Sequence, residues 1–185
     1  SRDGGSRCSC DARCQGKRYG LGAVGIAPTL LAHGACYLAV ATLTEALSCV
    51  KPIRIAPLFI LGHTPDRLLP IVVRERITQT VFTAAQGKLL NEAAAALGRK
   101  ATVHLKVDSG FHRLGTEDVE ELFSVCQEPN VEVEGIFSHL ALAGEAEDAK
   151  QYNRFMAVVE ALEARGVRFR YQHLADSIAA VDYPE

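Results

Sequence analysis

The sequence has no excess of charge of either sign and no long hydrophobic run. Its 185 residues carry a formal net charge of −2, which argues against a basic surface for nucleic acid or anionic lipid. The longest apolar runs, such as 37–43, are far shorter than the roughly 20 residues that span a bilayer. The first 18 residues lack the apolar core of a secretory signal. With 48% hydrophobic residues, the chain is expected to form one soluble domain without membrane or nucleic-acid partners.

The cysteines are badly distributed for a disulfide framework. Three of the six fall within the first 14 residues, and the other three lie singly in predicted core or helix segments. No Cys/His pair at zinc-finger spacing accompanies the first three, so no metal site is predicted. A reduced, cytoplasmic protein is the better interpretation.

Short apolar runs rich in β-formers alternate with segments of helical periodicity. Strands are predicted over 37–42, 58–61, 78–82, 103–108, 133–139 and 169–174, and helices over 23–33, 44–50, 65–73, 84–97, 116–126 and 145–165. Thr116 is expected to cap its helix, because two acids follow it. Nearly continuous apolar strands separated by helices predict a parallel sheet covered by helices. Periodicity cannot choose between a barrel and an open sheet, but no G-x-G-x-x-G motif follows a strand.

Polar and ionisable residues follow three successive predicted strands. They are Lys106, Asp108 and Arg113, then Ser138 and His139, then His173, Asp176 and Ser177. Each one alone is more simply a solvated loop charge, a structural histidine or a helix cap. Together, at strand–helix spacing, they are typical of the mouth of a β/α barrel, where active sites lie at the carboxyl ends of the strands.

The segment KVDSGFHRLG (106–115) begins at the end of one predicted strand. It is similar to the KVDTGMxRLG motif of the alanine racemases, which use pyridoxal phosphate (PLP). Shorter similarities occur in family order in YGLGAV (19–24), CYLAVATLTEAL (36–47), PLFILGHTP (57–65), VEGIFSHLA (133–141) and HLADSIAA (173–180). The resemblance implies a (β/α)8 barrel of the TIM type, cofactor PLP, an alanine substrate and a homodimer.

The resemblance also implies roles for individual residues. Tyr19 would hold the cofactor phosphate, and Arg113 would place its guanidinium beside the phenolic oxygen of PLP. Lys106 matches the lysine that is commonly carbamylated, and its carbamate would brace Arg113. His139 would belong to the polar network around the cofactor ring.

Two further positions lie in HLADSIAA. Ser177 would bind phosphate near a helix start. Asp176 stands where the family usually has asparagine, so its negative charge would lie near the phosphate.

The family's Schiff-base lysine is the one expected feature that the sequence does not supply. Its position, four residues before Tyr19, is occupied by Gln15, and an amide cannot form an imine. Lys17 lies two residues away and is a weak candidate. Cys14 to Arg18 can be written with synonymous codons that we chose. When these codons are read one base later, and one base is restored before Tyr19, they encode Val-Lys-Ala-Asn-Ala. That sequence is the family motif around the Schiff-base lysine. Residues 1–18 are therefore interpreted as a non-family, out-of-frame segment, and 19–185 as a partial barrel domain.

A complete barrel takes roughly 250 residues, so the closing strand or strands are expected to be missing. The expected function is PLP-dependent interconversion of L- and D-alanine for the bacterial cell wall, impaired or absent in this chain. Alternatives are a serine or broad-specificity racemase, a non-catalytic PLP-binding barrel, and an inert gene fragment.

Overall fold

The computed structural model describes residues 11–13, 23–35, 37–50 and 56–174, and these contain a seven-stranded sheet. Every neighbouring pair of strands is parallel, and the strands lie in chain order. The strands are β1 (Asp11–Arg13), β2 (Tyr37–Val40), β3 (Leu58–Ile60), β4 (Thr78–Val81), β5 (Ala101–Lys106), β6 (Val131–Phe137) and β7 (Tyr171–His173). A doubly wound sheet reverses its strand order at a switch point. The sequential order seen here therefore confirms the predicted partial β/α barrel.

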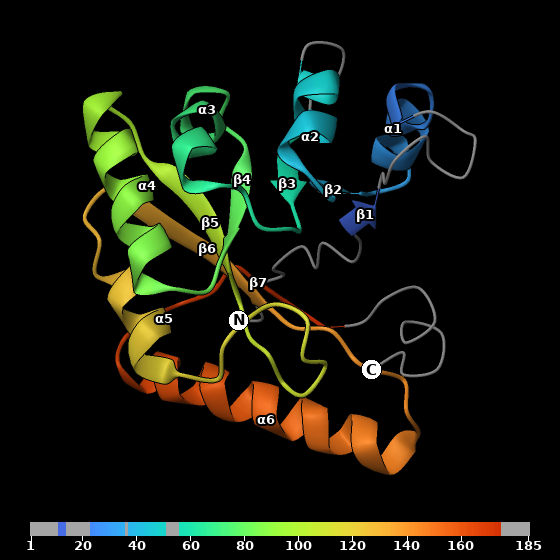
Figure 1. Ribbon diagram of the computed structural model, residues 1–185. Helices are drawn as coiled ribbons and strands as arrows, with labels where there is room; N and C mark the ends of the chain where they lie inside the picture. Colours follow the sequence, from blue (N-terminus) through green and yellow to red (C-terminus); the bar gives the residue numbers. More distant parts are fainter. Residues whose placement is uncertain (1–10, 14–22, 36, 51–55, 175–185) are drawn as a thin grey trace, which may run out of the picture.

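Helices occupy the connections between the strands and lie on one side of the curved sheet (Figure 1). They are α1 (Ala23–Ala32), α2 (Leu43–Val50), the 3-10 turn η2 (Asp66–Leu68) with α3 (Leu69–Arg74), α4 (Ala84–Ala96), α5 (Val119–Cys126) and α6 (Glu145–Ala164). Within the described residues, β1 and β7 are the two edges of the sheet. None of the described helices is both long and apolar enough to cross a bilayer.

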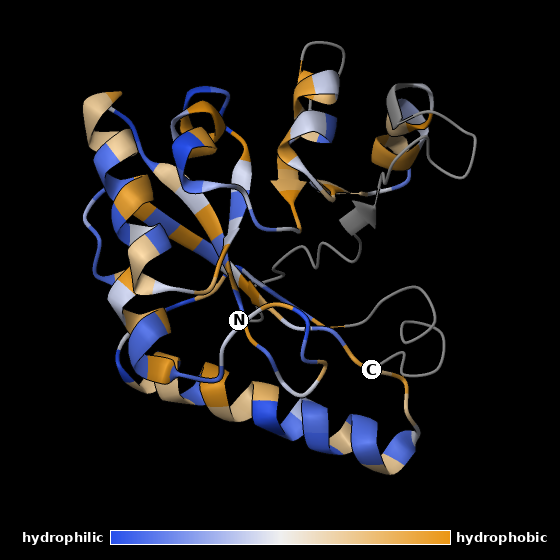
Figure 2. Ribbon diagram, viewed as in Figure 1, coloured by the Kyte–Doolittle hydropathy of each residue, from blue (hydrophilic) through white to orange (hydrophobic). Residues whose placement is uncertain are grey.

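Two apolar clusters fill the space between the sheet and the helices. The larger one contains Val103 and Leu105 of β5 with Leu122 of α5 and Leu162 of α6. The smaller one joins α1, α2 and α3 to β2 and β3. In the hydropathy view β3 is orange, β5 and β6 carry orange bands, and α6 carries a broad hydrophilic face (Figure 2). This arrangement is expected for a parallel sheet that helices cover.

The concave face of the sheet has its own core, which is aromatic. Tyr37, Phe59, Phe137 and Tyr171 come from four different strands and pack together. Phe59 is fully buried, and its ring lies 5.4 Å from that of Phe137 and 4.6 Å from that of His104. Alternate residues of β5 thus point to opposite faces, with Val103 and Leu105 toward the helices and His104 toward this aromatic cluster.

One local expectation was wrong. Thr116 does not begin a helix, because it is paired with Val107 beside β5. Helix α5 begins at Val119, and the side chain of Asp118 caps it by accepting hydrogen bonds from the backbone N–H groups of Glu120 and Glu121. The strands listed from the sequence begin at residue 37, and the structure adds β1 at 11–13, which pairs in parallel with β2. A three-residue strand without β-branched residues has no local signal, and only its partner strand defines it.

Candidate functional site at the carboxyl edge of the sheet

The segment 106–115 leaves β5 and turns back onto it. The backbone N–H of Thr116 donates to the carbonyl of Lys106 (3.2 Å), and the N–H of Asp108 donates to the carbonyl of Thr116 (3.2 Å). Gly115, with φ of 117°, lies at this return. A loop closed on its own strand holds the side chains between its ends at the carboxyl edge of the sheet, which is where barrel active sites are built.

Asp108 organises the start of this loop. Its Oδ1 accepts hydrogen bonds from the backbone N–H groups of Gly110 (3.1 Å) and His112 (3.0 Å). His112 adopts a left-handed backbone (φ 56°), and its ring Nδ1 lies 3.5 Å from Asp108 Oδ2. Burial opposes the charged carboxylate, but these N–H donors and nearby cations outweigh it and hold the pKa of Asp108 below its usual value. Asp108 therefore shapes the loop as an anion.

Lys106 is buried at the end of β5. Its Nζ donates to the carbonyl of Val107 (3.1 Å) and lies 4.9 Å from the centre of the Phe137 ring. Burial lowers the pKa of Lys106 to about 8, with Asp108 opposing this shift and the positive charge of Arg113 adding to it. A buried amine with a lowered pKa is partly unprotonated near neutral pH, and the unprotonated form is the one that reacts with electrophiles.

Arg113 and His139 contact the same aromatic ring. The Arg113 guanidinium lies 4.4 Å from the centre of the Phe111 ring, and the His139 ring meets Phe111 edge to face at 4.7 Å. Beneath them, Ser138 Oγ donates to the carbonyl of Val107 (2.8 Å), which ties the end of β6 to that of β5. The structure thus places Lys106, Arg113 and His139, to which the resemblance gives roles, at the carboxyl ends of β5 and β6. Gln15, Lys17, Tyr19, Asp176 and Ser177 lie outside the described residues.

Sequence reasoning missed a polar group below this edge, on the concave face. His104, two residues before Lys106, points to the same side of β5 and is fully buried. Its Nδ1 lies 3.2 Å from Nε2 of His173, and its Nε2 is 4.0 Å from Oε2 of Glu134. The available signal was the two-residue spacing of His104 and Lys106, which places both side chains on one face of a strand.

Acid is expected to weaken the fold through His104. Burial, with a further contribution from His173, lowers the pKa of His104 from 6.5 to about 3. Between those values the unfolded chain binds one more proton than the native protein. The contribution of His104 to the free energy of unfolding should therefore fall by about 1.4 kcal/mol for each pH unit below 6.5 and be constant above pH 7. His173, whose pKa is lowered to about 4, adds a loss in the same acid range.

Urea unfolding at about pH 5 and about pH 7 measures this loss. The His33→Gln control changes an exposed histidine and should keep the full dependence. His104→Asn should reduce it, and an unreduced pH dependence in that variant would contradict the prediction.

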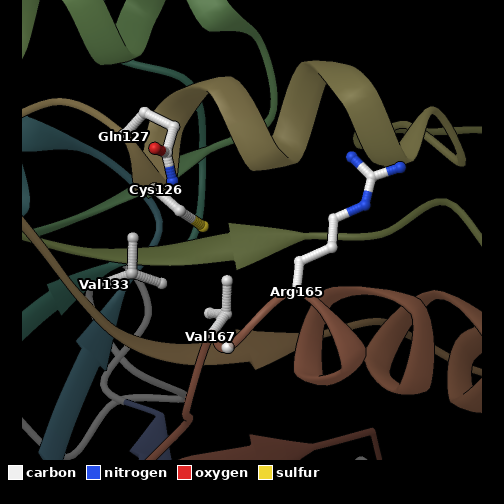
Figure 3. A pocket seen from close by; sticks show the side chains of 6 residues that line it. Cys126, Gln127, Val133, Arg165 and Val167 are labelled. Carbon is white, nitrogen blue, oxygen red and sulfur yellow. The ribbon is translucent and has the colours of Figure 1, made fainter.

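A pocket of about 260 Å³ lies at the other end of the sheet, between the ends of α5 and α6 and β6 (Figure 3). Its only thiol, Cys126, donates to the carbonyl of Leu122, and burial raises the pKa of that thiol to about 11. A protonated thiol is a poor nucleophile. Arg165 at the pocket rim is paired with Glu120. Within the described part of the chain, no group of three His, Cys, Asp or Glu side chains could hold a metal ion.

The comparisons agree with one another on the family. Residues 12–185 match the model "Alanine racemase, N-terminal domain". The chain is 38% identical to the alanine racemase of Clostridium tetani and 40% identical to that of Desulfovibrio desulfuricans, each over 90% of this chain but only 45% and 47% of the relative. The crystallised alanine racemase of Clostridium difficile 630 superposes with a TM-score of 0.89 at 32% identity, over 94% of this chain and 50% of its own. The chain spans about half the length of the relatives that it matches.

Proposed function

Because this chain belongs to the alanine racemase family, whose N-terminal-domain model its residues 12–185 match, we propose that it is the barrel part of a PLP-dependent alanine racemase. The whole enzyme would interconvert L- and D-alanine. The observation that carries the proposal is the placement of KVDSGFHRLG at the carboxyl end of β5, with Arg113 and His139 both in contact with the ring of Phe111. The proposed setting is a cytoplasmic, bacterial homodimer that supplies D-alanine for the cell wall.

The described residues suit the polar side of the cofactor. Arg113 is a permanent cation with a fixed fork of donors, which fits the phenolic oxygen of PLP. Lys106 would support it as a carbamate, because its buried amine has a pKa of about 8 and could react with carbon dioxide. The carbamate would replace a cation beside Arg113 with an anion. His139 would complete this side of the ring. Outside the described residues, the resemblance would give Tyr19 and Ser177 the phosphate and would put the negative charge of Asp176 near it.

The residue at the imine position does not suit the cofactor. When bound through a lysine, PLP supplies an electron sink for the α-carbon of an amino acid. Gln15 has an amide nitrogen that cannot form the required imine, so we derive no reaction step for this chain. We expect the unaltered protein to racemise neither L- nor D-alanine measurably. Alternatives within the same site are a serine or broad-specificity racemase and a non-catalytic PLP-binding barrel.

The out-of-frame origin of residues 1–18 is part of the proposal. The match to the family model begins at residue 12, so the proposal rests on Gln15 and not on a lack of similarity over 12–18. Gln15 lies four residues before Tyr19, where a restored frame would put the lysine. The nucleotide sequence across codons 10 to 20 tests this. Codons that give Val-Lys-Ala-Asn-Ala-Tyr after insertion of one base support it, and codons that cannot do so establish Gln15 as genuine.

Binding of PLP tests the site itself. We expect the unaltered chain to bind PLP non-covalently, and Arg113→Ala to weaken that binding about tenfold to a hundredfold, as loss of a hydrogen bond to a charged group does. A titration followed by PLP absorbance measures both. The control is Arg168→Ala, which removes an exposed cation whose guanidinium contacts backbone carbonyls near the end of α6. Equal affinity in both variants would contradict the role of Arg113, and no binding by any form would favour an inert gene fragment.

A further inference from the structure

A chain of polar side chains crosses the concave face of the sheet below the proposed site. It runs from Arg170 and Glu134 to His104 and then to His173, the last residue of β7. We propose that Glu134 fixes which nitrogen of each ring carries the proton in the His104–His173 pair, so that Nδ1 of His173 is the unprotonated, accepting nitrogen. The relevance of these proton positions to a PLP site rests on the proposed function. The proton positions themselves do not depend on it.

The local backbone of β6 brings these groups together. The pairing of β5 with β6 runs from Val103–Val133 to His104–Gly135, so that Glu134 is an extra, bulged residue. Bulges re-aim side chains, and Glu134 is aimed at the concave face, where its side chain is only 17% exposed.

The lack of a side chain at Gly135 leaves room for the contact between the two histidine rings. A Cβ at this position would lie 2.9 Å from Nδ1 and Cε1 of the His104 ring. Because glycine has no side chain, the ring of His104 on β5 passes over β6 and reaches His173 on β7. The pair therefore depends on a glycine in the strand that separates its members.

Each carboxylate oxygen of Glu134 accepts one hydrogen bond. Arg170 Nη1 donates to Oε1 (3.2 Å), and the hydroxyl of Tyr37 donates to Oε2. The hydroxyl of Thr78 lies 3.3 Å from the Tyr37 oxygen and can donate to it, since the Tyr37 proton is already used. Both carboxylate oxygens accept hydrogen bonds, so Glu134 presents negative charge to the next group along, Nε2 of His104.

The proton pattern follows from counting donors and acceptors. Each neutral imidazole carries one N–H, and the short contact between the rings needs one donor and one acceptor. Burial lowers the pKa of His104 to about 3 and that of His173 to about 4, so both rings are neutral at pH 7.

Two arrangements satisfy that count. If His104 carried its proton on Nδ1, its lone pair on Nε2 would face the Glu134 carboxylate at 4.0 Å. If the proton is on Nε2, it faces that negative charge, and Nδ1 accepts from Nε2–H of His173. The second arrangement is electrostatically favoured.

The same arrangement accounts for a buried nitrogen that makes no hydrogen bond. His104 Nε2 is inaccessible to solvent and has no hydrogen-bond partner within the described residues. The rings of Tyr37, Phe59 and Tyr171 enclose His104. A long-range attraction between Nε2–H and Glu134 offsets part of the cost of burying that unpaired donor. If Nε2 were unprotonated, its lone pair would be repelled by the Glu134 carboxylate, in addition to the cost of burying it without a hydrogen bond.

His173 links the proton positions of the histidine pair to the proposed cofactor site through the Phe137 ring. Its ring stacks on that of Phe137 (4.7 Å, 4° between planes), and Lys106 Nζ lies over the same Phe137 ring. Once Nε2 of His173 is a donor to His104, its Nδ1 accepts. Glu134 is accordingly a positioning residue, which acts through two rings.

Nitrogen NMR of the unaltered, 15N-labelled chain tests the proposal directly, because long-range couplings from the ring carbon protons identify the protonated nitrogen of each histidine. We expect Nε2–H on both His104 and His173. A proton on Nδ1 of His104 would overturn the proposal. The measurement requires neither PLP nor turnover, so its outcome is independent of the proposed function.

Glu134→Gln tests the cause of the pattern. This variant keeps the shape of the side chain and removes its charge. We expect one or both rings to populate the other tautomer, seen as an exchange of the protonated and unprotonated nitrogen shifts. The matched control is Glu132→Gln, which makes the same change two residues away on an exposed position of β6 and should leave both rings unchanged. Unchanged tautomers in folded Glu134→Gln would show that Glu134 does not set them.

Discussion

The Gln15→Lys variant is expected to carry a covalent pyridoxyl group at position 15 after treatment with PLP and borohydride, whereas the unaltered chain should carry none there. A lysine amine condenses with the PLP aldehyde to an imine, and borohydride reduces that imine to a stable secondary amine. A glutamine amide does neither. The expected effect is the difference between no label and near-complete label, measured by peptide mapping with mass spectrometry.

The placement of β1 is the structural reason to expect a specific reaction. Its last residue, Arg13, lies on a strand parallel to β2, so position 15 follows the carboxyl end of β1. The carboxyl ends of parallel strands meet at one edge of the sheet, which here carries Lys106 and His173. Surface lysines such as Lys88 and Lys150 report the background labelling in the same digest.

Lys17 gives the experiment its sharpest control. If Lys17 has a cofactor role, the unaltered chain will be labelled on it, and Lys17→Arg will abolish that label. If the frame interpretation holds, Lys17→Arg will leave the labelling of Gln15→Lys unchanged. Label on Gln15→Lys no stronger than on the surface lysines would contradict the proposed cofactor site.

Replacing Gly115 by alanine is expected to lower the free energy of unfolding by about 3 kcal/mol or more, the sum of a backbone strain and a steric clash. With φ at 117°, the backbone there is one that L-residues rarely adopt. A Cβ would lie 2.6 Å from the Asp108 nitrogen and 2.8 Å from the Val107 carbonyl carbon. Both are backbone atoms of the loop's own return to β5, so neither can move without breaking the turn.

Gly144 provides a matched control for this substitution. Its φ of 116° is nearly the same, but a Cβ there would meet nothing within 4 Å. Gly144→Ala therefore reports the backbone strain alone, about 1–3 kcal/mol. The difference between the free energies of unfolding of the two variants, measured in urea, gives the cost of the steric clash at Gly115. Equal losses would show that the clash at Gly115 is relieved, and the loop would then not be closed as described.

The Gly115→Ala variant should also weaken the binding of PLP. The return at Gly115 holds the loop that carries Arg113, so PLP affinity should fall in Gly115→Ala even at temperatures where the protein stays folded. Gly144→Ala, at the start of α6, should keep the affinity of the unaltered chain.

The sequence by itself determined the alternation of strands and helices, because each signal is local. Apolar runs such as Val103 to Val107 and the helical spacing of Phe155, Val158 and Leu162 need no partner to be recognised, and the structure buries them as expected. The motif 106–115 likewise identified the family. The cap of α5 was misplaced because Thr116 is a good capping residue locally, yet its backbone is used by pairing beside β5.

Only the tertiary structure determined the order of the strands and which side chains contact each other across the sheet. Strand order separated the barrel from the open sheet, since both have the same periodicity. β1 exists only through its pairing with β2. The contact of His104 with His173 joins residues 69 positions apart, and it needs a bulge at Glu134 and a missing side chain at Gly135. Periodicity places a residue on a face of its own strand, but which residue lies across from it depends on the register between strands, and register is set by packing over the whole sheet.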